Sequence, residues 1–206
     1  MNASQAYARL QGLGVPVIAT SDAAQVLGQS VDAANKTLKR LACSSLVTPA
    51  ARGVWALSGT IDPFLLPGYL TAPLPSYVSL QTALHHHGMI EQLPAVTYVV
   101  TLARARRLRT AFGTFSMHRV SPEFFGGFEV LESGVMMASP EKALLDVLYL
   151  SATRNRMFAR LPEIEIPATF DRKTAEKWMA RITSPQLARL VRYRYAAATR
   201  ARRDRA

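Results

Sequence analysis

Two short amphipathic segments separated by a glycine stand out in the pattern of apolar and polar positions along the chain. The first, residues 20–27, is expected to form a helix that Thr20 or Ser21 caps. Gly28 is expected to end that helix, because glycine adopts positive φ without strain. Ser30 then caps a second helix, so the pattern predicts two helices joined by a tight turn.

The second helix is predicted to have one buried face and one polar face. Apolar residues recur at helical spacing on the face that is expected to be buried: Val31, Ala34, Leu38 and Leu41. The opposite face carries an amide and three cations: Asn35, Lys36, Lys39 and Arg40. Such a helix packs by one side and offers hydrogen-bond donors to solvent or to a partner by the other.

A small antiparallel sheet is predicted beside these helices. Residues 46–57 have the composition of a β-hairpin, with a turn at 49–53 and Arg52 at its tip. A short strand at residues 15–18 is expected to close the sheet. Helix, tight turn, cationic helix and hairpin in this order are typical of a winged helix-turn-helix, which we assign to residues 1–60.

The remainder of the chain is predicted to be a connector followed by a second domain. Residues 61–76 are rich in proline and are expected to link the domains without regular structure. Residues 77–206 are expected to contain helices at 79–87, 139–150, 171–182 and 185–200, and extended segments at 95–102, 112–120 and 128–137. The predicted fold class is α+β, with an N-terminal winged helix-turn-helix followed by a mixed α/β C-terminal domain with a helical ending.

The composition is typical of a folded protein, and we expect neither a membrane span nor a secretion leader. Apolar residues make up 49% of the 206 residues and charged residues 19%. No apolar run approaches the roughly 20 residues needed to cross a bilayer. The single cysteine, Cys43, is expected to be a small core residue in a reducing compartment. We therefore expect a cytoplasmic protein that does not contact membranes.

The formal net charge of +11 is concentrated near the carboxyl end. Residues 1–70 have a net charge of +2, residues 71–150 are neutral, and residues 151–206 carry +9. Positive charge of this size favours binding to nucleic acid or to an acidic protein surface.

The sequence contains no pattern typical of catalysis or of a metal site. Residues 85–87 are consecutive histidines, whose side chains diverge by about 100° per residue on a helix and cannot share one ion. His118 has no cysteine or carboxylate pattern beside it. Residues 139–142 fit a helix start, and Asp146 is predicted to form a structural pair with Lys142 one turn earlier. We therefore expect a protein that is not an enzyme and needs no cofactor.

The predicted second helix and the hairpin tip carry the side chains suited to DNA. The expected contacts are Gln29, Ser30, Asn35, Lys36, Lys39, Arg40 and Arg52. Asn35 is the candidate for reading a base edge, because an amide pairs with adenine through two hydrogen bonds. Other arginines are either solvated or form an auxiliary contact with nucleic acid or a partner: Arg104, Arg106, Arg107, Arg189, Arg192, Arg194, Arg202 and Arg203.

Several sequence motifs occur in the same order as in a known protein family. They lie at residues 52–55 (RGVW), 77–88, 96–101 (VTYVVT) and 138–146 (ASPEKALLD). Together they resemble the AbiEi family of type IV antitoxins and related transcriptional regulators, over about residues 5–150. The motif at 138–146 is the most distinctive of them.

The resemblance implies two linked activities. The winged helix would bind inverted repeats in double-stranded DNA at the protein's own promoter and repress transcription. The second domain would neutralise a toxin of the nucleotidyltransferase class, encoded beside it, without a stable complex between the two proteins. Two alternatives remain open: a stand-alone winged-helix regulator without a toxin, and an RNA-binding protein that uses the basic C-terminal region.

Overall fold

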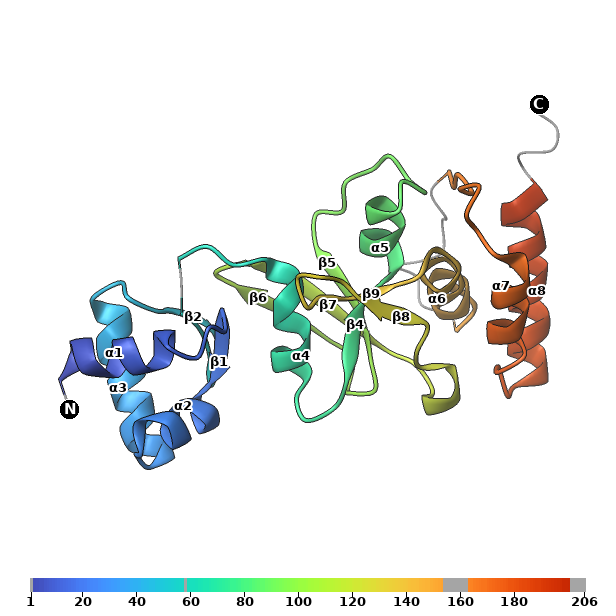
Figure 1. Ribbon diagram of the computed structural model, residues 1–206. Helices are drawn as coiled ribbons and strands as arrows, with labels where there is room; N and C mark the ends of the chain where they lie inside the picture. Colours follow the sequence, from blue (N-terminus) through green and yellow to red (C-terminus); the bar gives the residue numbers. More distant parts are fainter. Residues whose placement is uncertain (1, 58, 154–162, 201–206) are drawn as a thin grey trace. The chain divides into compact units, whose positions relative to one another are not determined.

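The computed structural model describes residues 2–57, 59–153 and 163–200, and the chain has an α+β fold (Figure 1). It contains N-terminal helices with a three-stranded antiparallel sheet, then a six-stranded mixed sheet and C-terminal helices. The chain divides into two compact units. One is residues 1–73 with 108–114, and the other is residues 74–107 with 115–206. Within the described residues, no helix is long and apolar enough to cross a membrane.

Three helices and a small sheet make up most of the N-terminal unit. The elements are α1 Ala3–Gln11, β1 Val17–Ala19, α2 Thr20–Leu27, α3 Val31–Cys43, β2 Thr48–Ala51 and β3 Val54–Ala56. The central strand β3 pairs antiparallel with β1 on one side and β2 on the other, which confirms the predicted closing strand. The core between helices and sheet includes Leu10, Leu38, Leu41 and Leu57, each at most 1% exposed.

The turn between α2 and α3 forms as the sequence predicts. Gly28 has φ +63°, and nothing lies within 4 Å of where a Cβ would be, so backbone conformation rather than space favours glycine here. Ser30 caps α3 by accepting a hydrogen bond from the backbone N–H of Ala33 at 3.2 Å. The turn therefore fixes where α3 begins.

The predicted cap of α2 is wrong. Ala19 occupies the N-cap position, where no side-chain hydrogen bond is made. The hydroxyl of Thr20 instead accepts the indole N–H of Trp55 at 2.9 Å, and both residues are buried. A buried indole N–H without an acceptor would be costly, so satisfying Trp55 takes precedence over capping the helix.

The proline-rich stretch is not the irregular connector that its composition predicted. It contains a 3-10 turn at Pro63–Leu65 and helix α4 at Leu66–Thr71. Asp62 accepts the N–H of Phe64 at 2.8 Å, and Pro63 begins the turn, where its missing N–H does no harm. Prolines in a first turn therefore start a short helix here instead of preventing one.

The second sheet is mixed and has six strands in the order β6-β7-β5-β4-β9-β8. Its strands are β4 Ser76–Val78, β5 Thr97–Thr101, β6 Arg106–Thr110, β7 Gly113–Arg119, β8 Phe128–Val130 and β9 Met136–Ala138. β4 runs antiparallel to β5 and parallel to β9. The single extended segment predicted at 128–137 is in fact two antiparallel strands, because Gly134 at φ +83° lets the chain reverse between them.

Helices accompany this sheet, and α6 is the most buried of them. They are α5 Leu80–His86, α6 Pro140–Ala152, α7 Arg172–Met179 and α8 Pro185–Arg200, in good agreement with the predicted helices. α6 contacts α5, α7, α8 and strand β9. Ser139 caps α6, as predicted, by accepting the N–H of Lys142 at 3.3 Å. Ser79 precedes α5 but does not cap it, because its hydroxyl donates to Asp146 instead.

We expect Ser30→Ala to lower the free energy of unfolding of the N-terminal unit by about 1 kcal/mol, because the N–H of Ala33 loses its acceptor. Ser21→Ala is the matched control, since the Ser21 hydroxyl is exposed and bonds to its neighbour Asp22. Urea denaturation of both variants measures the difference. Equal losses of stability would contradict the assignment of the cap.

Candidate nucleic-acid interface

Helix α3 separates apolar and cationic side chains onto opposite faces. Ala34, Leu38 and Leu41 have no exposed surface. The other side carries exposed Lys36, Lys39 and Arg40, with Asn35 half-buried beside them: these four residues are the polar face of α3. Packing of the apolar side against the core therefore directs the polar face outward.

One member of the predicted buried stripe is exposed. Val31 is 55% exposed, whereas Thr37, which was not predicted to be buried, is 4% exposed. Successive residues of an α-helix are rotated by about 100°, so Val31 and Thr37 flank the stripe of Ala34, Leu38 and Leu41 on opposite sides. The buried side of α3 includes Thr37 and leaves out Val31. Cys43, predicted to be a core residue, is also exposed, because it falls on the polar side at the end of the helix.

Hydrogen bonds connect the turn to the polar face of α3. The Thr37 hydroxyl donates to the side-chain oxygen of Gln29 at 3.1 Å, and the Arg40 guanidinium donates to the Thr37 oxygen at 3.3 Å. The side-chain carbonyl of Gln29 is thus occupied within the chain, and the Arg40 side chain is held along the helix. This arrangement restricts two of the expected DNA-contacting side chains before any ligand binds.

The hairpin tip is shorter than the predicted turn. Strand β2 already includes Pro49, with an irregular register between Pro49 and Ala51, and the reversal takes place at Arg52-Gly53. Gly53 has φ +77°, a conformation that a side chain would strain. Arg52 is exposed at this tip, as predicted.

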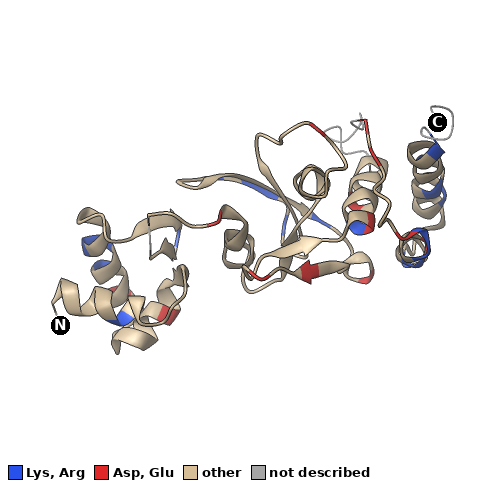
Figure 2. Ribbon diagram, turned by 45° about the horizontal axis from the view of Figure 1, so that its top comes forward, with Lys and Arg blue, Asp and Glu red and all other residues tan. Residues whose placement is uncertain are grey.

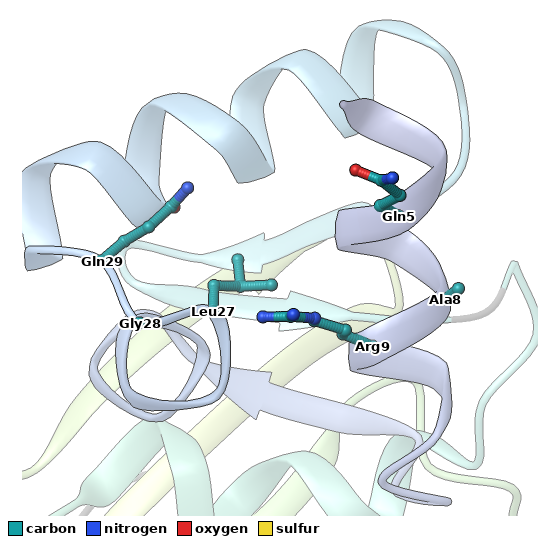
Figure 3. A pocket seen from close by; sticks show the side chains of 6 residues that line it. All are labelled: Gln5, Ala8, Arg9, Leu27, Gly28 and Gln29. Carbon is teal, nitrogen blue, oxygen red and sulfur yellow. The ribbon is translucent and has the colours of Figure 1, made fainter. Parts of the chain in front are cut away.

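A hollow of about 600 Å³ lies beside the α2–α3 turn (Figure 3). Its lining residues are Gln5, Ala8 and Arg9 of α1 with Leu27, Gly28 and Gln29. Figure 3 shows the Arg9 side chain extending from α1 toward Leu27. Arg9 thus adds a cation near the turn, which sequence spacing alone did not reveal because α1 reaches this place only through folding.

The further arginines have different environments. Basic residues lie in β6 and in the C-terminal helices (Figure 2). Those with exposed side chains are Arg104, Arg106, Arg107, Arg189 and Arg192. Arg106 and Arg107 belong to β6, an edge strand of the six-stranded sheet.

Arg194 differs from these exposed arginines in its surroundings. Arg194 is half-buried, and its guanidinium donates to the Ser151 hydroxyl of α6, so it holds α8 in place. Among the apolar residues of α8, Val191 is buried, whereas Leu190 is 37% exposed. Arg202 and Arg203 lie outside the described residues.

A cluster of polar side chains is enclosed in the second unit. The Lys142 ammonium donates to Asp146, confirming the predicted pair, and to the Tyr77 hydroxyl at 2.9 Å. Asp146 also accepts from Ser79 at 2.6 Å and from Tyr77 at 3.1 Å. The side chains of Lys142 and Asp146 have no exposed surface. We call Tyr77, Ser79, Lys142 and Asp146 the buried polar cluster.

Burial dominates the electrostatics of this cluster. It lowers the pKa of Lys142 and raises the pKa of Asp146, and the charge of each partner opposes the shift of the other. Burial together with the Asp146 charge raises the pKa of Tyr77 well above its ordinary value, so its hydroxyl remains a donor. The cluster is satisfied internally and has the character of a structural element of the core.

Aromatic rings complete the enclosure of Lys142. Its ammonium lies 4.1 Å from the ring centroid of Phe124 and 5.3 Å from that of Trp178. The backbone at Gly127 passes so close that a Cβ there would lie 2.9 Å from Lys142 Cγ and 2.9 Å from Trp178. The GG turn at residues 126–127 therefore permits the close approach of Lys142 and Trp178.

His85 and His87 each approach a different backbone carbonyl, and the ring centroids of His86 and His87 lie 5.1 Å apart. His87 Nε2 lies 2.7 Å from the carbonyl oxygen of Ala138, and His85 Nδ1 lies 3.3 Å from that of Ile90. Burial lowers the pKa of His118 to about 4, so this side chain is neutral near pH 7. In the part of the chain that the structure describes, no group of three or more potential ligands is placed to hold a metal ion.

We expect Lys142→Met to lower the free energy of unfolding by about 3–5 kcal/mol, because the Asp146 carboxylate then stays buried without its cation. The double variant Lys142→Met/Asp146→Leu should cost less than the sum of the two single variants, since no unpaired charge remains. Lys173→Met, at an exposed position on α7, is the control. Additive losses in urea denaturation would contradict the coupling.

Comparison with known proteins does not assign this chain to a family. The chain matches no family model, and no curated protein shows significant similarity to it.

Proposed function

We propose that the protein is a sequence-specific DNA-binding repressor whose N-terminal unit is a winged helix-turn-helix. The polar face of α3 is the observation that carries this proposal. It is directed outward by a fully buried apolar side, preceded by a tight turn at Gly28, and followed by a hairpin with Arg52 at its tip. Recognition helices that enter a major groove have this arrangement of elements.

The polar face of α3 divides into residues suited to bases and residues suited to phosphates. Asn35 has an amide that can donate to and accept from adenine in the major groove. Lys36, Lys39 and Arg40 are flexible cations that neutralise phosphates without reading sequence. The exposed Arg52 at the hairpin tip is proposed to contact the DNA backbone or the minor groove. Binding at the promoter, at inverted repeats, would repress transcription by excluding polymerase.

The second unit is proposed to neutralise a toxin of the nucleotidyltransferase class. This proposal rests on the resemblance to AbiEi antitoxins. The most distinctive motif of that resemblance, residues 138–146, coincides with the start of α6 and includes Lys142 and Asp146 of the buried polar cluster. Similarity at those positions supports a common fold rather than a shared contact surface. A surface contact with the toxin would have to involve other residues of this unit, such as the exposed Arg106 and Arg107.

An RNA-binding function is the second candidate, favoured by one observation on α8. Tyr193 is 73% exposed and follows the exposed Arg192. An exposed aromatic ring beside a cation is suited to stacking on an unpaired base. Binding to single-stranded RNA that Tyr193→Ala abolishes, with no preference for promoter DNA, would favour this candidate.

We expect Lys36→Ala/Lys39→Ala to weaken binding to every DNA sequence and to reduce the salt dependence of binding. The slope of log K against log salt should fall by about one for each phosphate that these lysines neutralise. Lys173→Ala/Lys177→Ala is the matched control, because both of these lysines are exposed on α7. Gel-shift titration at several salt concentrations measures both slopes. An unchanged slope in the α3 variant would remove α3 from the interface.

We expect growth arrest by the adjacent gene product to be relieved when the full chain is expressed with it. Lys36→Ala/Lys39→Ala should relieve it equally well, since the neutralising activity is assigned to the second unit. Growth curves with and without this protein measure the effect. An adjacent gene product that is harmless alone, or toxic regardless of this chain, would contradict the antitoxin function and leave the stand-alone regulator.

A further inference from the structure

Val31 is an exposed apolar side chain on the first turn of α3. It is 55% exposed, compared with 43% for Leu13 and 40% for Val15 in the same unit. Valine is also a weaker helix former than alanine, lysine or glutamate. Val31 therefore presents an apolar surface on α3 that the core of this unit does not cover.

Val31 lies beside Asn35 on the helix surface. The two residues are four apart, and side chains at this spacing are neighbours on one side of an α-helix. The exposed Asp32 is next to Val31, and its carboxylate would be repelled by phosphates. The first turn of α3 therefore carries no cation to bind a phosphate, whereas Lys36 and Lys39 of the later turns are suited to the backbone.

Base edges in the major groove differ in one apolar feature, the 5-methyl group of thymine. The two methyl groups of Val31 form no hydrogen bonds. Among base edges they therefore suit the apolar 5-methyl group of thymine. Four residues of helix rise by about 6 Å, close to two base-pair steps of about 3.4 Å. We propose that Val31 contacts the 5-methyl group of a thymine about two base pairs from the base read by Asn35. This inference rests on the proposed DNA-binding function.

Replacing thymine by deoxyuridine tests the contact, because it removes only the methyl group. A preferred sequence is first selected with the full chain from a pool of random duplexes, and each thymine in it is then replaced singly. At one position the replacement should weaken binding by the wild-type chain roughly fourfold, the factor expected for burial of one methyl group. Val31→Ala should show no such loss there, since the partner of the methyl group is already absent.

Two variants keep the test specific. Val31→Ala should fold, because the side chain is exposed and alanine is the strongest helix former. Val15→Ala, an exposed valine outside α3, should respond to deoxyuridine as the wild-type chain does. Identical responses of wild type and Val31→Ala at every thymine would overturn the contact while leaving DNA binding intact. A pool without any enriched sequence would overturn the DNA-binding proposal, and the role of Val31 with it.

Discussion

The burial of one side of α3 is the constraint on which the proposed function depends. Ala34, Leu38 and Leu41 are fully enclosed, and full burial of each leucine is worth about 1.5–3 kcal/mol. Interactions of an exposed charged side chain contribute less free energy than this, typically about 0–1 kcal/mol. The rotation of α3 about its axis is therefore set by the core, and the outward direction of Lys36 and Lys39 follows from it.

The buried polar cluster imposes a comparable constraint on the second unit. Lys142 and Asp146 lie one turn apart on α6, and their partners Tyr77 and Ser79 come from the segment around β4. A buried ion pair adds little net stability, but removal of one partner is costly, so the four residues specify how α6 meets the sheet. Because this cluster is enclosed, the neutralising activity proposed for the second unit would have to reside in its exposed side chains.

Local signals in the sequence were sufficient where neighbouring residues determine structure. Gly28, Ser30 and Ser139 act within one helical turn, and the sequence predicted all three positions. The sequence was misleading where a distant residue competes: Trp55 takes the hydroxyl of Thr20, and helix periodicity alone placed Val31 in the core. The α+β class and most elements were thus predictable, whereas the enclosure of Lys142 by aromatic rings required the tertiary structure.

Lysine reactivity reports whether α3 is the surface that contacts DNA. The chain has five lysines: Lys36, Lys39, Lys142, Lys173 and Lys177. Acetylation followed by mass spectrometry, with and without a duplex containing the selected sequence, reports on each of them in the full chain. We expect DNA to protect the two lysines of α3, to leave the two of α7 reactive, and not to alter the enclosed Lys142. Protection on α7 with full reactivity on α3 would contradict this expectation.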